Sequence, residues 1–445
     1  MATTTLSRTF TAGDKDKWTF STWLKKAELG SGSTDANFIF CAYADASNYT
    51  SLHFDTDETL HFYNRAGGGA AGQQVTSALF KDVGAWYHLV CVWDSGNASS
   101  TDRMKLYVNG AEVTAFAVDN APTQDLDSSA NVSGNTCYLG TQSGSNMYFT
   151  GVLAHSHFCD GQAYAASDFG ETDSTSGIWV AKTSPSVTYG TNGFFLKYQD
   201  TSNFGDDSSG ETNDFTLSGT MTQTQDTPDN NFSTINPLSY HVITALGSLA
   251  NSNTTATAVS SAHYGTFVPT LAADTGKWYV EGKVTVTGAD RGSAGVVSME
   301  DGGINLSTSW YVGEHSTDTG YQSDGNNWVA GSSSSGWSTY TTGDIIGIAL
   351  DLDNRKVYFH KNGVYEGSGD PVAGTNGLTV TADVDIGFAF SAYNGSKWDI
   401  NYGNGYFGTT AVSTSESDDA GIGSFEYDVP AGYYTLCTTN LGDQS

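Results

Sequence analysis

Apolar and polar side chains alternate with a period of two in many segments of the chain. Residues 278–286 and 384–390 place apolar side chains at nearly every second position, and polar or small residues occupy the positions between them. This alternation is typical of a strand with one buried and one solvated face. Residues 86–93 are apolar on both faces apart from His88, which predicts a central strand.

Turn residues between these segments support antiparallel pairing. Asn-Gly pairs stand at 109–110, within DRMKLYVNGAEV, and at 362–363, within NRKVYFHKNGVY. Two residues with positive φ form the type I′ turn of a tight hairpin, and Asn-Gly is its strongest signal. Many short strands with Gly, Ser and Asn between them predict an all-β protein, built as two antiparallel β-sandwich (jelly-roll-like) domains in tandem.

Chain length and charge distribution suggest where these domains end. At roughly 100–200 residues per domain, 445 residues suffice for two or more. No Lys or Arg occurs between Lys197 and Lys277, or after Lys397. We therefore predict a first sandwich over residues 1–198, an acidic polar joiner over 199–236, a second sandwich over 237–411 and a C-terminal tail over 412–445.

Composition excludes several classes of function. The chain has 48 acidic and 18 basic side chains, a formal charge of −30, and no basic cluster. Such a chain repels phosphate backbones and cannot release counterions, so we expect no nucleic-acid binding. No apolar run approaches the roughly 20 residues that span a bilayer, so we expect no membrane insertion. The start, MATTTLSRTF, predicts no signal peptide, and the five scattered cysteines are expected to be reduced.

Longer motifs resemble two known families. The segments LSRTF and DKWTFSTWLKK, then DVGAWYHLVCVWD, DRMKLYVNG and LAHSHFCDGQAYAASDFGE resemble the concanavalin-A-like, laminin-G-type lectin domains of bacteriophage virion proteins. The segments TGKWYVEGKV, GDIIGIALDLDNRKVYFHKNG and DIGFAFSAYNGSKWDINYG resemble a SPRY domain. The joiner and the closing VPAGYYTLCTTNL are similar to segments of the same phage proteins. The resemblance implies two β-sandwiches and a place on a virus particle.

The concanavalin-A-like fold also includes glucanases, which makes glycan hydrolysis the sharpest enzymatic hypothesis. These enzymes need two carboxylates at a defined separation, provided by an E-x-D-x-x-E strand. The nearest match here is Glu171-Thr172-Asp173, but Ser176 stands where the third acid belongs. No G-x-S-x-G nucleophile elbow is present. We therefore expect a protein that is not an enzyme.

Two metal sites are conceivable from the residue types. His155, His157 and Cys159 alternate along one strand and could form part of a zinc site, although no fourth ligand can be named. Calcium is the more plausible cofactor, because aspartate pairs recur in predicted loops. The alternative is that these acids are solvated turn residues, as we expect for Asp351 and Asp353 beside the second hairpin. The pairs are Asp55/Asp57, Asp125/Asp127, Asp206/Asp207 and Asp418/Asp419.

Aromatic residues suggest a binding surface in the second domain. Sugar rings stack on exposed Trp or Tyr, while amides bond their hydroxyls. Residues 310–340 interleave aromatic side chains with SDGNN and GSSSSG, which are typical of recognition loops. The alternative is that the rings belong to the core, which we favour for Trp310 and Tyr311. The predicted ligand-binding residues are Tyr321, Asn326, Asn327, Trp328, Trp337 and Tyr340.

These observations predict a non-catalytic structural protein on the exterior of a phage particle, synthesised in the host cytoplasm. It would be a tail fibre, adhesin or head-decoration protein that binds host-surface glycan, other virion proteins, or both. Copies would associate, because weak repeated sites gain avidity. The tail from Val412 is a candidate docking segment. The alternatives are a purely architectural virion protein and a glycan depolymerase.

Overall fold

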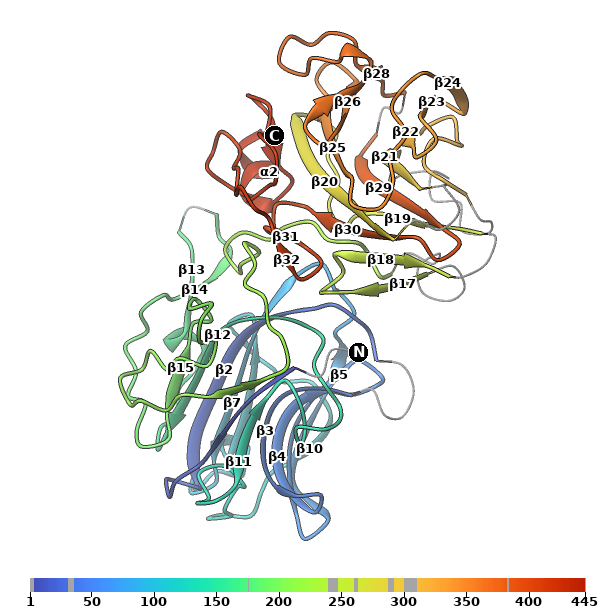
Figure 1. The fold of residues 1–445 in the computed structure, drawn as a ribbon. Helices are drawn as coiled ribbons and strands as arrows, with labels where there is room; N and C mark the ends of the chain where they lie inside the picture. The colour runs from blue at the N-terminus through green and yellow to red at the C-terminus, as the bar shows by residue number, and fades with distance from the viewer. Residues whose placement is uncertain are drawn as a thin grey trace. The chain divides into compact units, whose positions relative to one another are not determined.

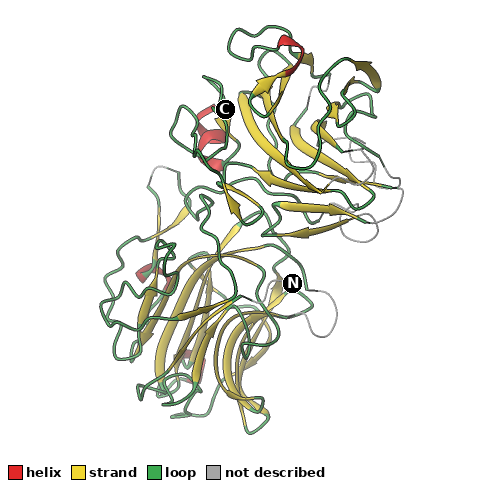
Figure 2. Cartoon of the chain, in the orientation of Figure 1, coloured by secondary structure: helices red, strands yellow, loops and turns green. Residues whose placement is uncertain are grey.

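The computed structural model describes residues 4–30, 36–174, 176–238, 247–259, 263–286, 292–299, 310–381 and 384–444. The protein is nearly all β (Figure 2). Its contacts divide the chain into two compact units, residues 1–223 and 224–445. None of the described helices is long and apolar enough to cross a membrane.

The first unit is a sandwich of two antiparallel sheets (Figure 1). One sheet contains, in spatial order, β10 (Phe116–Asn120), β6 (Gly69–Leu79), β5 (Thr59–Ala66), β4 (Asn48–Phe54), β3 (Asn37–Asp45), β11 (Thr136–Leu139), β1 (Thr5–Thr9) and β16 (Thr216–Ser218). The other contains β15 (Phe194–Leu196), β12 (Gly151–Asp160), β2 (Lys17–Lys26), β7 (Trp86–Asp94), β8 (Met104–Val108) and β9 (Ala111–Glu112). A separate hairpin pairs β13 (Gly170–Thr172) with β14 (Trp179–Ala181).

Aromatic side chains fill the space between these two sheets. Phe20 of β2 stacks on Phe40 of β3 with ring centroids 4.6 Å apart, and Trp18 lies 5.8 Å from the Phe62 ring of β5. The predicted central strand is confirmed as β7, which pairs with β2 on one side and β8 on the other. Burial of these large rings supplies the driving force that holds the two sheets together.

The second unit repeats the sandwich plan. One sheet contains β17 (Gly247–Ala250), β18 (Thr255–Ala258), β30 (Lys397–Asn401), β20 (Lys277–Val286), β25 (Ile345–Asp351), β26 (Lys356–Lys361) and β27 (Val364–Tyr365), with β28 (Leu378–Thr379) on β26 and β33 (Tyr434–Thr435) on β20. The other contains β19 (Tyr264–Phe267), β29 (Ile386–Tyr393), β21 (Ser293–Ser298), β22 (Thr319–Gln322), β23 (Asn326–Val329) and β24 (Ser332–Ser335). The remaining elements are β31 (Tyr406–Phe407), β32 (Thr410–Ala411), α2 (Thr438–Gln444) and the 3-10 turns η1 (Ser100–Asp102), η2 (Ala166–Asp168) and η3 (Glu366–Ser368).

Close approach of the two sheets requires a glycine on β20. A β-carbon on Gly282 would lie 2.3 Å from the Phe390 ring of β29, so a larger residue would push the sheets apart. Both predicted hairpin turns are confirmed. Asn109 and Gly110 have φ values of 48° and 84°, and Asn362 and Gly363 have 51° and 82°.

The predicted faces of β20 are only partly correct. Trp278, Val280 and Val284 lie in the core as expected, but a bulge after Val284 leaves Val286 47% exposed. The opposite face is not solvated, because Glu281 and its neighbour Tyr279 are fully buried. In the second apolar segment, Ile386, Phe388 and Phe390 are core residues, whereas Asp383 lies outside the described residues.

The C-terminal tail covers the face of β20 that carries Tyr279 and Glu281. Strand β33 pairs with β20 in parallel, and Phe425 and Tyr433 are buried in a cluster with Tyr279. The Glu281 carboxylate accepts the backbone N–H groups of Glu426 and Tyr427, each at 2.9 Å. The tail predicted as a docking segment is therefore an integral layer of the second unit, because its aromatic residues cover sheet residues that would otherwise face water.

The predicted joiner is likewise part of both units. Strand β16 extends the first sheet by pairing with β1, whereas Phe232 and Ile235 are buried in the second unit. The polar composition of residues 199–236 concealed this, because isolated Phe and Ile anchors suffice to attach an extended segment to a sheet edge.

Candidate functional site

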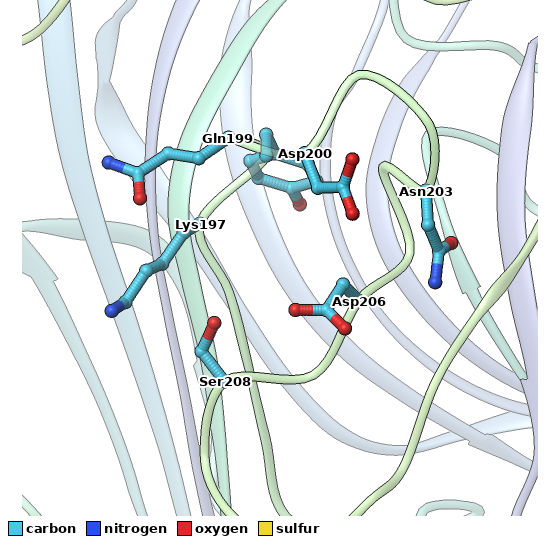
Figure 3. A pocket seen from close by; sticks show the side chains of 7 residues that line it. Lys197, Gln199, Asp200, Asn203, Asp206 and Ser208 are labelled. Carbon is cyan, nitrogen blue, oxygen red and sulfur yellow. The ribbon is translucent and has the colours of Figure 1, made fainter.

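A polar pocket lies in the first unit, where the chain leaves the edge strand β15 (Figure 3). Its volume is about 310 Å3. The lining residues are all within one short segment that starts directly after the strand: Lys197, Tyr198, Gln199, Asp200, Asn203, Asp206 and Ser208.

Local hydrogen bonds hold the pocket segment in shape. Asp200 Oδ1 accepts the backbone N–H of Ser202 at 2.8 Å and its hydroxyl at 2.6 Å, and Asn203 Oδ1 accepts the N–H of Gly205 at 3.2 Å. Asp and Asn favour such turns because their side chains bond the backbone two residues further on.

The base of the pocket is anchored to the sandwich. Tyr198 has a φ of 59° and donates its hydroxyl to Ser156 Oγ of β12 at 2.7 Å. Asp207 accepts the backbone N–H of Phe195 in β15 at 2.8 Å and that of Asn213 at 2.8 Å. A site built on a segment fixed at both ends needs little reordering when it binds a ligand.

The pocket presents both signs of charge. The Lys197 ammonium lies 5.2 Å from the centroid of the buried Phe195 ring, and Figure 3 shows it on the opposite side of the pocket from Asp200 and Asn203. Among the described residues, no ion pair joins Lys197 to Asp200 or Asp206. The hydrogen bonds from Ser202 hold the pKa of Asp200 below its ordinary value. A general acid needs a raised pKa, so this carboxylate is suited to accepting hydrogen bonds rather than to donating a proton.

Sequence reasoning missed this site. The sequence predicts Asp206 and Asp207 as a possible calcium pair and places the other pocket residues at the end of the first sandwich or in the joiner. The available signal is the dense run of Asp, Asn and Ser after FFLKYQ, which predicts consecutive turns. That signal cannot indicate a hollow, because the pocket depends on how those turns fold back against β15.

Tyr321 and Tyr340, predicted as ligand-binding residues, are core residues in the structure. They are 0% and 4% exposed, and their rings lie edge to face with centroids 4.9 Å apart. Tyr340 donates its hydroxyl to the backbone oxygens of Gly292 and Tyr321, each at 2.9 Å. These two predictions are corrected, because a ring enclosed by the core offers no face to a ligand.

Trp328 and Trp337 contact different sets of residues, and only Trp337 packs against the core of the second unit. Trp337 packs against the core side, 5.0 Å from the Tyr321 ring and 5.8 Å from Phe359. Trp328 lies opposite Gly320 in the strand pairing, contacts the ring of Tyr311 at 5.2 Å and donates its indole N–H to Gln322 at 3.3 Å. Both tryptophans are half-buried, as are Asn326 and Asn327. The predicted residues therefore do not form one site.

The metal-site candidates have other roles. A bulge in the pairing of β12 falls between Ala154 and His157, and His155 has a φ of 48°, so the predicted alternation is interrupted. His157 is buried, stacks on Phe195 with centroids 4.0 Å apart and is hydrogen-bonded to the Tyr189 hydroxyl at 3.0 Å. Within the described part of the chain, no group of three or more His, Cys, Asp or Glu side chains is arranged to hold a metal ion.

The aspartate pairs mostly stabilise turns. Both carboxylate oxygens of Asp418 accept hydrogen bonds, from the backbone of Ala420, Ile422 and Thr435 and from the side chain of Asn440. Asp351 accepts the backbone N–H of Asn354 within its own turn, as expected of a turn residue, but it is buried and paired with Lys277 rather than solvated. Asp353 accepts the backbone N–H of Gly276, just before β20. All five cysteines are free and buried.

The residues nearest to a glucanase motif lie at the surface. Glu171 is exposed on β13, and Asp173 accepts the backbone N–H and hydroxyl of Ser176 at 2.7 and 2.9 Å. Asp173 therefore stabilises the turn between β13 and β14, and Ser176 takes the position where the third acid would stand.

Comparison with known proteins supports the lectin-like character of the first unit. Residues 3–167 match the family model of the concanavalin A-like lectin/glucanases superfamily. Comparison with curated proteins finds no match.

Similar solved structures include SPRY domains and a pentraxin. The SPRY domain of human HERC1 is 17% identical, with a TM-score of 0.28, and the similarity covers 35% of this chain and 91% of that one. The TRIM65 PSpry domain is 12% identical, with a TM-score of 0.30 and coverage of 38% and 92%. The heptameric SAP-like pentraxin of Limulus polyphemus is 19% identical, with a TM-score of 0.28 and coverage of 37% and 72%.

Proposed function

We propose that the protein is a non-catalytic saccharide-binding protein on the exterior of a bacteriophage particle, and that the polar pocket of its first unit holds the saccharide. The observation that carries this proposal is the set of groups lining the pocket. The residues that line the hollow of about 310 Å3 carry two carboxylates, two amides, an ammonium and the Ser208 hydroxyl, whereas the Tyr198 hydroxyl is donated to Ser156. Such groups can donate to and accept from the hydroxyls of a sugar, and the volume suits a small ligand.

The match of residues 3–167 to a lectin and glucanase superfamily makes both binding and hydrolysis relevant. Hydrolysis needs a general acid as well as an ionised carboxylate, and the lowered pKa of Asp200 fits only the second role, which favours binding. The incomplete E-x-D-x-x-E pattern at Glu171 and Asp173 supports the same choice.

The virion location rests on the order of the sequence motifs, which resembles phage proteins with a lectin-like domain followed by a SPRY domain. On a particle, copies would contact neighbouring virion proteins and present many weak sites to a host surface. Such a display gains avidity from effective concentration.

A glycan array probed with the full chain tests saccharide binding, and Ser208→Phe supplies the pocket-specific variant. Among the described contacts the Ser208 hydroxyl has no side-chain partner, so a phenyl ring should fill the pocket without breaking a bond of the fold. Ser208→Ala is the matched control. We expect Ser208→Phe to lose array binding and Ser208→Ala to retain most of it. Equal binding by both would contradict the pocket assignment.

Immunogold microscopy of intact particles tests the location. Labelling of the tail or head surface is expected, whereas labelling only of lysed cells would contradict a virion role. The alternative of a purely architectural protein predicts particle labelling with no array binding. A depolymerase would release reducing sugar from host polysaccharide, and Asp206→Asn would abolish that release.

A further inference from the structure

Strand β24 is an open edge of the second unit. It pairs with β23 in an unbroken register, from Val329 opposite Ser332 to Asn326 opposite Ser335, and it ends the described sheet (Figure 1). Among the described residues, only those of β23 form hydrogen bonds with Ser332–Ser335. On its outer side the strand therefore presents backbone N–H and C=O groups to solvent, which is the template that an added strand needs.

Both ends of the β23–β24 hairpin are fixed. Ala330 and Gly331 have φ values of 52° and 76° and form the turn, and the Ala330 N–H donates to the backbone oxygen of Asp318 at 3.0 Å. At the other end, the Trp337 N–H donates to the backbone oxygen of Gly325 at 3.2 Å. All four residues of β24 are exposed, so nothing in the unit covers the edge. An edge held in this way needs little further ordering when a second strand joins it.

Other edge strands carry features that discourage pairing. Strand β10 has a bulge after Phe116 and the exposed Asp119, and a bridge between Leu196 and Asp207 covers part of β15. Strands β9 and β27 are only two residues long. Short length, charge, bulges and covering loops are the usual protection of a sheet edge. Strand β24 has four residues, an unbroken register and neither a charge nor a proline, so its edge is open to pairing.

The segment around β24 is uncharged in a strongly acidic chain. Residues 325–343 contain no Asp, Glu, Lys, Arg or His, although the formal charge of the chain is −30. Two copies of such a chain repel each other, so they approach most easily where neither carries a charge. Four identical serines also face their own kind in any register, with hydroxyl groups that can bond across the strands. These two features favour a second copy of the chain as the partner of this edge.

We propose that β24 is a contact between copies of this chain, in which β24 of one copy pairs antiparallel with β24 of a second copy across a twofold axis. A twofold axis places the same surface on both sides, which suits a strand whose residues are all alike. Four-residue strands bury little of the roughly 800 Å2 per partner of a stable interface, so the contact is weak in solution and gains strength where many copies are held together. This inference concerns the assembly of copies and stands whether or not the pocket binds a saccharide.

Cross-linking of the full chain through an introduced cysteine tests this contact. All five native cysteines are buried, so a surface cysteine is the one that reacts with a short bis-maleimide. Ser333→Cys places the thiol on β24, and Ser417→Cys, at an exposed serine of the same unit, is the matched control. Across a dilution series, we expect at least about fivefold more covalent dimer from Ser333→Cys. Equal yields would indicate random collision and overturn the inference.

Charge on the strand provides a second test. In the Ser333→Cys chain, Ser332→Asp/Ser334→Asp should lower the dimer yield at low ionic strength, because like charges then meet across the paired strands. Ser332→Asn/Ser334→Asn has nearly the same shape without the charge and should keep the yield. Matching thermal melting curves show that the exposed substitutions leave the fold intact. Equal dimer yields from the two double variants would contradict pairing through β24.

Cross-linking on intact particles separates the occupants of the edge. If the Ser333→Cys chain links there to another virion protein and never to its own copy, β24 receives a different strand and the inference is wrong. The glycan array measures saccharide binding independently. Dimers with a silent array would support this inference while rejecting the saccharide site, and array binding without dimers would do the reverse.

Discussion

The ammonium of Lys26 and the carboxylate of Glu58 form an ion pair inside the first unit, where the two side chains are 1% and 5% exposed. Lys26 also donates to the backbone oxygen of Phe80 at 3.0 Å and lies 4.3 Å from the centroid of the Phe54 ring. Burial lowers the pKa of Lys26, and the hydrogen bond with Glu58 opposes that shift. The stability of the first unit therefore depends on both charged side chains being present.

Replacement of one partner should be costly. We expect Lys26→Met to lower the free energy of unfolding of the first unit by about 3 kcal/mol, because it leaves the buried Glu58 carboxylate without its ammonium partner. The double variant Lys26→Met/Glu58→Gln should recover part of that loss, since it removes both charges. Urea titration followed by tryptophan fluorescence measures both. A single variant as stable as the wild type would contradict this account.

Glu281 should make the stability of the second unit depend on pH. Burial raises its pKa from 4.5 to about 7, although Tyr279 and two backbone N–H groups donate to the carboxylate. Between these pH values the folded state binds more protons than the unfolded state, so this group's contribution to stability is present below pH 4.5 and is lost as pH rises toward 7. The expected loss is roughly 3 kcal/mol.

Glu281→Gln isolates that contribution. The neighbouring His360 has its pKa lowered to about 3 by burial, which acts on stability in the opposite direction, so the wild-type profile alone does not separate the two. We expect the difference in unfolding free energy between variant and wild type to shift in favour of the variant as pH rises. Denaturant titrations across that range measure it. A difference that is constant with pH would show that Glu281 does not titrate there.

Trp337 should contribute to stability rather than to ligand binding. Trp337→Ala removes a half-buried ring that packs on Tyr321 and Phe359, and should cost roughly 2 kcal/mol. Saccharide affinity should be unchanged. Trp328→Ala is the comparison, because its ring lies on the outer face against Tyr311. A loss of saccharide affinity in Trp328→Ala would instead indicate a ligand site on that face.

Deletion of the tail should unfold the second unit. A chain that ends at residue 411 loses β33, Phe425, Tyr433 and the backbone donors that satisfy Glu281. We expect limited proteolysis to degrade residues 224–411 of this variant and to spare the first unit. If that region stays resistant, the tail is dispensable for folding and becomes available as the docking segment that the sequence suggested.

Local sequence patterns determined most of the secondary structure. The Asn-Gly pairs dictated both type I′ hairpins, because few other residues tolerate two consecutive positive φ values. The apolar run ending at Trp93 predicted a central strand, and the alternation in residues 386–390 predicted a core-facing side, because strand side chains point to alternate faces. The all-β class and the lectin-like first domain could be inferred without coordinates.

Tertiary structure alone decided which residues remain accessible. Tyr321 and Tyr340 have Gly, Ser and Asn as sequence neighbours, which is typical of binding residues. In the structure both side chains are buried in the core, Tyr321 on β22 and Tyr340 in the segment after β24. The second face of β20 is buried because a tail more than 140 residues away in sequence returns to cover it. The pocket forms because consecutive turns fold back against β15. Periodicity specifies the direction of a side chain relative to its own strand, whereas exposure depends on which distant segment packs against that face.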